Sequence, residues 1–298
     1  MSQAAPISRD DTQAKLNLRG AAGMKVRASQ TYTTAERVEE SAAQFADHFC
    51  LAFQDQRYSY AQLNEAVNRA AHMLHDDLGV RRGDVVGLAL ENRAEFFFYW
   101  FGLMKVGAVA SFINTNITGK PLAHAFEVTH AKACIVGEEV LAQFDAPEVA
   151  HIAKWLVRDA EKPATPEQIA SCAFDFSSKL ASSSTANPPA AWRAGLVAEM
   201  PAIYVFTSGT TGLPKAAIIS HARWLMTGYV MQQTLHTTAE DVFYAYLPLY
   251  HGAASLSLTP TAFVMGSGLV TRRKFSKSEF WNDVRKYGIT AMQYVGEI

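Results

Sequence analysis

The segment that decides the fold spans residues 204–215 and reads Tyr204-Val205-Phe206-Thr207-Ser208-Gly209-Thr210-Thr211-Gly212-Leu213-Pro214-Lys215. Its first residues are apolar and favour a β-strand, whereas the rest form a polar loop with four hydroxyl side chains and two glycines. Hydroxyls and backbone amides can bind phosphate oxygens, and glycines let the backbone approach a ligand closely. Lys215 adds a positive charge at the end. We therefore interpret residues 207–215 as a loop that binds polyphosphate.

This loop differs from the two common nucleotide-binding motifs. The P-loop pattern G-x-x-x-x-G-K-[ST] does not fit, because Gly209 and Gly212 are only three positions apart and Lys215 follows Pro214. The dinucleotide fingerprint G-x-G-x-x-G does not fit either. The simpler alternative is a polar turn between two strands, since serine, threonine, glycine and proline all favour turns.

Composition indicates a globular protein with a large core. The chain has 298 residues, of which 49% are hydrophobic and 18% charged, and its formal net charge is −1. Without a basic cluster or a strong overall charge, we expect no nucleic-acid partner. Cys50, Cys134 and Cys172 are widely spaced, which predicts reduced cysteines and neither a disulfide framework nor a metal site.

Targeting signals are weak. Residues 1–27 lack the apolar core of a signal peptide, and the longest apolar run, residues 96–104, is shorter than the ~20 residues that span a bilayer. That run is interpreted as the buried face of a helix. We expect a cytoplasmic protein, and peripheral association with a membrane stays open because Arg272-Arg273-Lys274 could meet anionic headgroups.

The order of elements predicts an α/β protein with two doubly wound sheets and flanking helices. We expect a flexible leader over residues 1–30 and one domain over 31–298. Within it, a first sheet covers about residues 31–174, a linker rich in serine, alanine and proline about 175–200, and the phosphate loop with a second sheet about 201–298.

Apolar periodicity places the elements of this domain. Helices are expected over residues 61–78, 95–106, 121–129, 253–264 and 277–287, and from residue 221 with Ser220 as N-cap. Strands are expected over residues 85–90, 108–113, 131–136, 202–206, 216–219, 242–246, 269–270 and 290–294. Gly79 should end the first of these helices.

The residues of the loop resemble the phosphate-binding signature of the adenylate-forming (AMP-binding) superfamily. Residues 78–88 resemble a further pattern of the superfamily. Other segments resemble its branch of long- and very-long-chain fatty acyl-CoA synthetases and fatty-acid transport proteins: residues 100–108, 113–116, 247–251, 274–276 and 293–297. The resemblance covers nearly all of residues 58–298. It implies an incomplete N-terminal domain of the acyl-CoA synthetase fold, whose β-barrel and C-terminal subdomain we expect to be missing from this chain.

The resemblance also implies an activity. Family members use ATP, usually with Mg²⁺, to convert a carboxylate into an acyl-adenylate, which coenzyme A then converts into an acyl-CoA. The implied substrate is a long- or very-long-chain fatty acid, and this chain would carry the phosphate-binding half of the machinery. Two alternatives stay open: a catalytically inactive fragment that binds a nucleotide or lipid, and an adenylation enzyme that passes the acyl group to a carrier protein.

Site residues follow from the same resemblance. The β- and γ-phosphates would be held by Thr207, Ser208, Gly209, Thr210, Thr211 and Gly212, and Lys215 would neutralise departing pyrophosphate. His251 would lie beside the carboxylate and the α-phosphate, although it could instead cap the next helix. Tyr250 would line the acyl channel, and Tyr294 and Gly296 the acyl pocket; a core aromatic and a strand end are the alternatives. No metal ligand is assigned to this chain.

Overall fold

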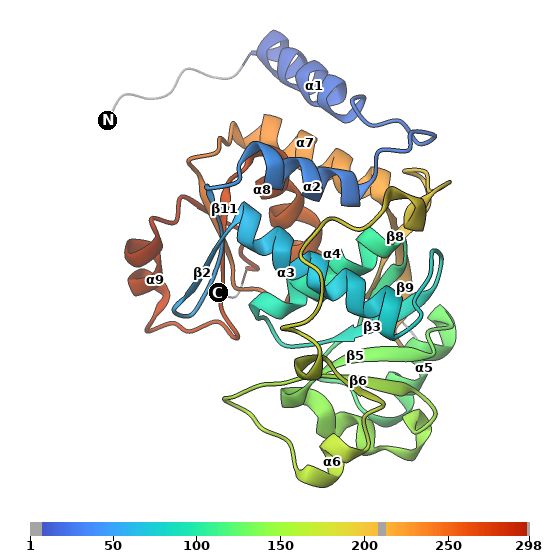
Figure 1. Cartoon of the computed structure of the whole chain (residues 1–298). Coiled ribbons are helices and arrows are strands. Elements are labelled where there is room, and N and C mark those ends of the chain that lie inside the picture. The colour runs from blue at the N-terminus through green and yellow to red at the C-terminus, as the bar shows by residue number, and fades with distance from the viewer. Residues whose placement is uncertain (1–7, 208–212, 297–298) are drawn as a thin grey trace.

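The computed structural model describes residues 8–207 and 213–296. These residues form two sheets with helices between them and on their outer sides (Figure 1). The seven-stranded sheet has the order β7 (Phe174–Asp175), β6 (Ala153–Val157), β5 (Ala133–Gly137), β3 (Val85–Ala89), β4 (Val109–Phe112), β8 (Pro201–Thr207) and β9 (Lys215–Ser220). The five-stranded sheet has the order β12 (Ala291–Met292), β10 (Val242–Ala245), β11 (Gly268–Thr271), β1 (Phe49–Phe53) and β2 (Gln56–Ser59).

Both sheets are mainly parallel. Only the pairs β1/β2 and β8/β9 are antiparallel among the described strands. The α-helices of the described residues are α1 (Arg9–Gly23), α2 (Thr34–Gln44), α3 (Tyr60–His72), α4 (Ala94–Val106), α5 (Gly119–Thr129), α6 (Pro166–Ala170), α7 (His221–Leu235), α8 (Thr259–Met265) and α9 (Phe280–Tyr287). Two π-helical turns occur at η1 (Met73–Asp77) and η6 (Ala253–Leu258), and short 3₁₀ turns at η2 (Glu138–Asp145), η3 (Pro147–Val149), η4 (Phe176–Ser178) and η5 (Ala190–Arg193). The predicted α/β class with parallel sheets and flanking helices is confirmed.

Helix α4 is the centre of the larger core. Its Phe96, Phe97, Trp100 and Phe101 are fully buried and pack with side chains from strands of both sheets. The ring of Trp100 meets the ring of Trp224 from α7 edge to face, with centroids 6.2 Å apart. The apolar run is therefore a buried helix face, as predicted. No helix in the described ranges is both long and apolar enough to cross a bilayer.

The two sheets interleave along the sequence, which differs from the expected division at residues 175–200. Strands β8 and β9 belong to the seven-stranded sheet, where β8 lies parallel to β4. Strand β1 belongs to the other sheet and lies parallel to β11. Parallel strands are joined by long crossovers, so the order of strands in the sequence does not tell which sheet each one joins.

The expected flexible leader contains a helix. Ser8 and Asp11 form a capping box at the start of α1, because the Ser8 hydroxyl accepts the Asp11 amide at 3.0 Å and the Asp11 carboxylate accepts the Ser8 amide at 3.3 Å. The last turn of α1 packs on α7, where Gly23 lies against Met226 and Val230. This capping signal is visible in the sequence, and the prediction of a leader without structure overlooked it.

The segment between residues 175 and 200 crosses the surface, as expected of a linker, and it is fastened to α3. The guanidinium of Arg69 donates to the carbonyl of Leu180 at 2.9 Å, and the amide of Asn68 donates to the carbonyl of Thr185 at 2.7 Å. The ammonium of Lys105, buried in α4, donates to Asn68 Oδ1 at 2.6 Å and to Asn187 Oδ1 at 3.0 Å. The segment therefore holds one fixed path over the helices.

Candidate functional site

The candidate phosphate loop connects the two strands of an antiparallel hairpin. Thr207, at the end of β8, pairs with Lys215, at the start of β9, and both are exposed. Residues Ser208, Gly209, Thr210, Thr211 and Gly212 lie outside the described residues. The structure thus locates both ends of the candidate phosphate loop, at the positions where the sequence predicted the strand ends.

The hairpin ends at an edge of the sheet that is suited to ligand binding. Because Phe112 of β4 pairs in parallel with Val205 of β8, Asn114 and Thr207 each lie two residues beyond this pair. Helix α4, between β3 and β4, packs in the core between the sheets, whereas α5, between β4 and β5, packs in a separate core on the other face. Where two successive crossover helices lie on opposite faces of a sheet, a crevice is left outside the carboxyl ends of the strands.

Asn92 connects this edge to the other sheet. It is buried directly after β3, and its Nδ2 donates to the carbonyl of Leu247 at 2.8 Å, while its Oδ1 accepts the amide of Leu249 at 2.7 Å. Residues 246–251 form the loop that follows β10. Asn92 thereby clamps the loop that carries Tyr250 and His251 and sets its position relative to β3.

Tyr250 is held by a pair of asparagines. Its hydroxyl accepts from Asn116 Nδ2 at 2.8 Å, and the backbone amide of Asn116 donates to Asn114 Oδ1 at 2.9 Å. Burial raises the pKa of Tyr250, although hydrogen bonds with Thr115 and Asn116 oppose the shift. The hydroxyl is therefore protonated at neutral pH and free to donate its own proton.

His251 lies beside Tyr250, with ring centroids 4.6 Å apart. Its carbonyl accepts the hydroxyl of Ser255 at 3.0 Å, so the backbone of His251 joins it to the π-helical turn η6. Although the residue is exposed by surface area, neighbouring protein atoms partly desolvate the ring and lower its pKa. Since the neutral imidazole is favoured, a ring N–H can donate to an oxyanion without bringing a full charge. The N-cap position of η6 is occupied by Gly252, and the His251 side chain does not cap this turn.

Tyr294 and Gly296 lie elsewhere. Tyr294 is 66% exposed and lines an aromatic cavity of about 340 Å³ with Tyr246, Phe275, Lys277, Phe280, Trp281 and Met292. Neither Tyr250 nor His251 lines this cavity, and Gly296 is exposed with open space around its Cα. The structure therefore does not bring together all the residues that were expected to contact the acyl chain.

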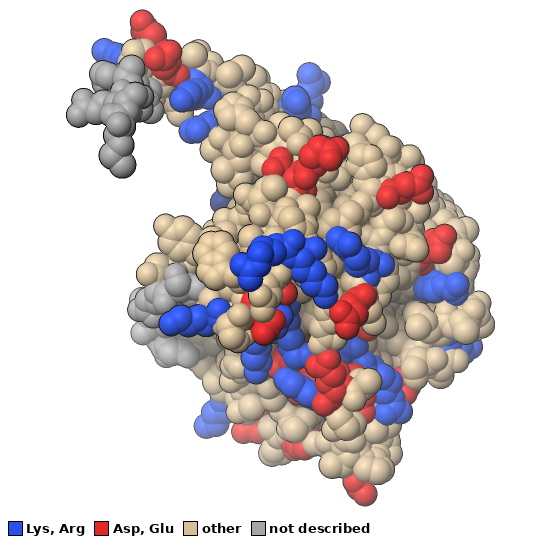
Figure 2. All heavy atoms as spheres, turned by 90° about the vertical axis from the view of Figure 1, so that its left-hand side faces the viewer, with Lys and Arg blue, Asp and Glu red and all other residues tan. Residues whose placement is uncertain are grey.

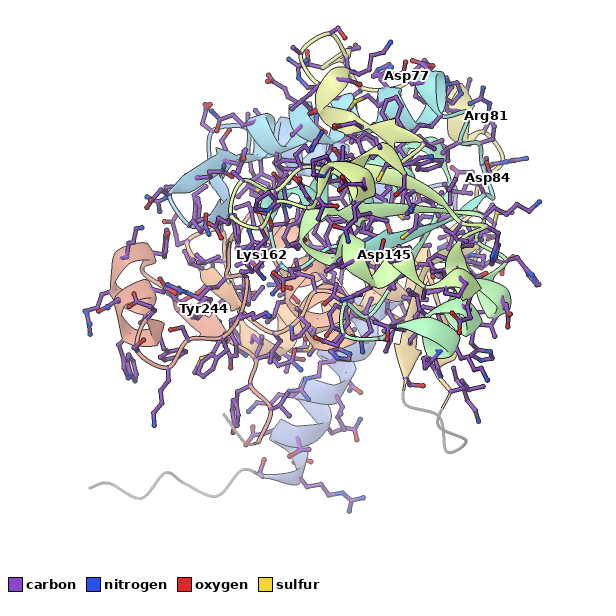
Figure 3. The ribbon with its side chains drawn as sticks, turned by 90° about the horizontal axis from the view of Figure 1, so that it is seen from below. Asp77, Arg81, Asp84, Asp145, Lys162 and Tyr244 are labelled. Atoms are coloured by element: carbon purple, nitrogen blue, oxygen red, sulfur yellow. The ribbon has the colours of Figure 1, made fainter. Side chains whose placement is uncertain are left out.

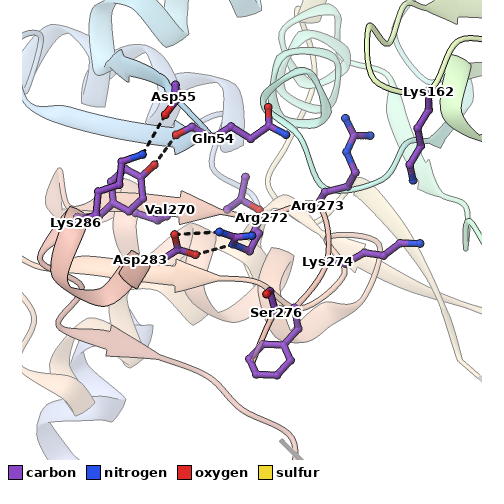
Figure 4. Close-up of a pocket in the computed structure, with 13 residues that line it drawn as sticks. Gln54, Asp55, Lys162, Val270, Arg272, Arg273, Lys274, Ser276, Asp283 and Lys286 are labelled. Atoms are coloured by element: carbon purple, nitrogen blue, oxygen red, sulfur yellow. Dashed lines mark hydrogen bonds and ion pairs between the residues drawn. The ribbon is translucent and has the colours of Figure 1, made fainter. Parts of the chain in front are cut away.

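Charged residues converge beside the clamp. Glu91 accepts from Lys162 at 2.6 Å, from Lys274 at 3.3 Å and from Arg273 at 3.3 Å. Lys162 follows β6 and lies where the two sheets meet (Figure 3). Burial alone would raise the pKa of Glu91, but Lys162 and Lys274 outweigh it and hold the pKa below its ordinary value. The cations line a cavity of about 510 Å³ at the ends of β1 and β11 (Figure 4).

Sequence reasoning missed most of these residues, yet they share a signal. Each polar group directly follows a short apolar strand: residues 91–93 follow β3, residues 114–116 follow β4, and residues 272–274 follow β11. Since all three strands are parallel to their neighbours, such residues gather at carboxyl edges, where α/β proteins bind ligands. The signal was therefore present before the structure was known.

Comparison with known proteins decides the family. The family description "AMP-binding enzyme" matches residues 38–298. The chain belongs to the AMP-binding enzyme family. The predicted membership of the AMP-binding family is thereby confirmed.

The relatives of this AMP-binding chain are longer than it is. It is 36% identical over 244 residues to "Long-chain fatty acid transport protein 6" of Mus musculus, covering 81% of this chain and 38% of the relative. It is 32% identical over 283 residues to "Medium/long-chain-fatty-acid--CoA ligase FadD6" of Mycobacterium tuberculosis, covering 94% of this chain and 45% of the relative. The chain spans less than half the length of these curated relatives.

Solved structures share the fold of this AMP-binding chain. The N-terminal domain of FACL13 from Mycobacterium tuberculosis has a TM-score of 0.71 at 21% identity, covering 87% of this chain and 62% of that one. MbtA from Mycobacterium smegmatis has a TM-score of 0.74 at 24% identity, covering 97% of this chain and 51% of that one. At these identities the likeness concerns the fold.

The clamp in this AMP-binding chain is testable by replacing Asn92 with alanine. The change leaves the carbonyl of Leu247 and the amide of Leu249 buried without their partner, which should lower the free energy of unfolding by about 1–3 kcal/mol. Urea denaturation measures this loss. Asn282→Ala, on the exposed side of α9, is the matched control, and a loss no larger than that of the control would count against the clamp.

Proposed function

We propose that the protein activates a fatty acid with ATP, forming an acyl-adenylate and pyrophosphate, and then an acyl-CoA. The observation that carries the proposal is the pairing of Thr207 with Lys215 at the carboxyl edge of the sheet, beside the asparagines that hold Tyr250. Membership of the AMP-binding family supports ATP as a substrate. The names of the relatives support a medium- or long-chain fatty acid and, for the ligase, coenzyme A.

The first step joins two anions, so its main requirement is to stabilise negative charge. A carboxylate oxygen of the fatty acid attacks the α-phosphorus, and the bond to the β-phosphate oxygen breaks with release of pyrophosphate. The ammonium of Lys215 and the hydroxyl of Thr207 would bind the β- and γ-phosphate oxygens, where charge accumulates as pyrophosphate leaves. The neutral ring of His251 would donate to an oxygen of the carboxylate or of the α-phosphate.

Two further roles complete the first step. Mg²⁺, when bound, would neutralise phosphate charge. Within the described residues no group of three acidic, histidine or cysteine side chains could hold a metal ion. Tyr250 would line the path of the acyl chain.

In the second step the sulfur of coenzyme A attacks the acyl carbonyl carbon, and the bond to the phosphate oxygen of AMP breaks. A carrier-protein thiol could take the place of coenzyme A in the same reaction. Comparing the two thiols as acceptors of a preformed acyl-adenylate distinguishes these cases. We further propose that the protein meets its apolar substrate at a membrane surface, with which it associates peripherally.

Replacing Lys215 with alanine should weaken ATP binding about tenfold, because a charge-assisted hydrogen bond contributes roughly 1.5–3 kcal/mol and part of it is screened at an exposed site. Isothermal calorimetry on the chain measures the change. Lys132→Ala is the matched control, since Lys132 is exposed and precedes β5 at the opposite edge of the sheet. Equal effects of both changes would remove Lys215 from the phosphate site.

Exchange of pyrophosphate into ATP tests the activity itself. Exchange that depends on a fatty acid, and that falls as the acyl chain is shortened, would support adenylation and define the substrate. Binding of ATP without exchange would favour the alternative of an inactive nucleotide-binding protein. Absence of ATP binding would contradict both.

A further inference from the structure

The segment from Arg272 to Tyr287 differs in charge from the rest of the molecule. It contains six basic and two acidic side chains, a formal net charge of +4, whereas the whole chain has −1. Arg272 and Arg273 are half-buried and paired with Asp283 and Asp159. The other four basic side chains are exposed on and around α9: Lys274, Lys277, Arg285 and Lys286. Figure 2, which faces the α9 side, shows many Lys and Arg side chains across this face, with Asp and Glu side chains between them.

Large apolar side chains are exposed next to these cations. Trp281, on the outer side of α9, is 63% exposed, and Phe275 precedes the helix. Both line the aromatic cavity of about 340 Å³ that also contains Met292 and Tyr294. Of the tryptophans in the chain, Trp100, Trp155 and Trp224 are buried and Trp192 stacks on His75, so only Trp281 is strongly exposed. We call Lys274, Phe275, Lys277, Trp281, Arg285, Lys286, Met292 and Tyr294 the α9 surface.

This combination matches the chemistry of an anionic bilayer. Tryptophan and phenylalanine prefer the boundary between headgroups and acyl chains, while lysine and arginine extend toward phosphate groups. A second copy of the chain is disfavoured as the occupant, because two identical surfaces of like charge repel each other. The bases of a single-stranded nucleic acid could stack on these aromatic rings, but the flexible thioether side chain of Met292 in the same cavity offers no flat face for a base and packs well with acyl chains.

The α9 surface also adjoins the candidate site. The ammonium of Lys274 contacts Glu91 Oε1 at 3.3 Å, and Glu91 directly precedes Asn92, which clamps the loop of Tyr250 and His251. Phe275 lines both the cationic cavity and the aromatic cavity. A molecule bound through α9 would therefore have the candidate site near the bilayer surface, from which an apolar substrate can be taken.

We propose that the α9 surface docks the protein on anionic membranes, with Trp281 and Phe275 at the headgroup boundary and Lys274, Lys277 and Lys286 over lipid phosphates. This docking rests on the peripheral membrane association proposed above and names the surface that makes it. Because it requires neither nucleotide nor turnover, its failure would leave the proposed adenylation standing.

Co-sedimentation of the chain with vesicles tests the proposal. The chain should bind vesicles of phosphatidylcholine with phosphatidylserine, bind phosphatidylcholine alone more weakly, and dissociate at high salt. Each lysine near a charged leaflet contributes about a fivefold gain in partitioning, so K274Q/K277Q/K286Q should lose roughly 100-fold. Trp281→Ala should lose about tenfold. Leu235→Ala and Lys132→Gln, exposed residues outside the α9 surface, should lose nothing measurable.

A spectroscopic measurement reports on Trp281 directly. Lipids brominated near the headgroup should quench part of the tryptophan fluorescence of the wild-type chain, and Trp281→Phe should abolish that quenching while leaving vesicle binding largely intact. Equal binding to neutral and anionic vesicles, equal losses in Leu235→Ala and Trp281→Ala, or quenching that survives in Trp281→Phe would overturn the proposal. If the chain does not bind vesicles, a dimer that depends on Trp281, or binding to single-stranded nucleic acid, would also overturn the proposal.

Discussion

Replacing Arg273 with leucine should lower the free energy of unfolding by about 3 kcal/mol, the lower end of the loss expected when one partner is removed from a buried ion pair. The side chain of Arg273 is 13% exposed and that of Asp159 only 3%. Arg273 Nη1 donates to Asp159 Oδ2 at 2.6 Å, and Nη2 donates to Asp159 Oδ1 at 3.2 Å. Without the guanidinium, the Asp159 carboxylate keeps the amide of Glu161 at 2.9 Å and one cation among the described residues, Arg93, whose Nη1 lies 3.4 Å away.

The loss should be large because the pair joins the two sheets. Arg273 follows β11 of the five-stranded sheet, and Asp159 follows β6 of the seven-stranded sheet. Burial alone would raise the pKa of Asp159, but the hydrogen bonds from Arg273 and from the amide of Glu161, together with the charge of Arg93, hold it below its ordinary value. The carboxylate is therefore ionised in the folded protein and needs its cation.

Three variants in urea denaturation separate this explanation from a general loss of charge. Lys286→Met removes the exposed pair with Asp55 and should change the free energy of unfolding by less than about 1 kcal/mol. Arg273→Leu combined with Asp159→Asn should be more stable than Arg273→Leu alone, because the uncompensated charge is gone. If the double variant is no more stable than the single one, the loss does not come from the orphaned carboxylate.

Local sequence patterns predicted most of the strands and helices, because the residues of each segment favour the structure that the segment adopts. Strands near residues 85–90, 131–136 and 202–206 were expected from short apolar runs, and β3, β5 and β8 occupy these positions. Gly79 ends the first of the predicted helices, as expected, with a positive φ of 68°. Ser220 caps α7 by accepting the Arg223 amide at 3.2 Å.

Strands β1 and β2 were missed for a physical reason. The turn between them contains Gln54, whose φ is 53°, so it lacks the glycine or asparagine that normally signals such a turn. The partner of β1 is β11, more than 200 residues later, where Leu51 pairs with Leu269. No local pattern contains a pairing across that distance, so the composition of each sheet could not be read from the sequence.

Part of the candidate site could likewise be predicted from local sequence, and part of it depends on contacts between distant segments. The position of the phosphate loop was predicted, because strand and loop are adjacent in the sequence. The clamp was not, because Asn92 and Leu249 are 157 residues apart and belong to different sheets. Tyr294 was expected with the acyl-pocket residues, but a position at the end of a strand does not specify the face on which its side chain lies. Its place in the aromatic cavity follows from tertiary packing.

Acidification from pH 6.5 to pH 4 should destabilise the protein through His221 by roughly 3 kcal/mol. His221 is fully buried, and burial lowers its pKa from the ordinary value of 6.5 to about 4, against the opposing charge of Glu36. Between these two pH values the His221 ring is protonated in the unfolded chain but neutral in the folded protein. Stability contributed by the neutral ring is therefore complete above pH 6.5 and is lost as the pH falls toward 4.

The surroundings of His221 explain why the ring stays neutral. It is the first residue of α7, and its Nδ1 accepts the amide of Thr34 at 3.4 Å and lies 3.0 Å from the Thr34 hydroxyl. Thr34 is the first residue of α2, so the positive ends of two helix dipoles meet at this ring and oppose an imidazolium. With Nδ1 accepting, the proton is on Nε2, for which the described residues offer no hydrogen-bond partner.

Replacing His221 with asparagine should flatten the dependence of stability on pH between 4 and 6.5, because asparagine can accept from Thr34 but cannot take up a proton. Urea denaturation of both proteins across this range measures the difference in slope, which is independent of any constant loss caused by the smaller side chain. His151→Asn, at an exposed histidine, is expected to leave the slope unchanged. Since His221 directly follows the strand that carries Lys215, its protonation should loosen β9 and α7 first. If wild type and His221→Asn show the same slope, other groups cause the acid sensitivity.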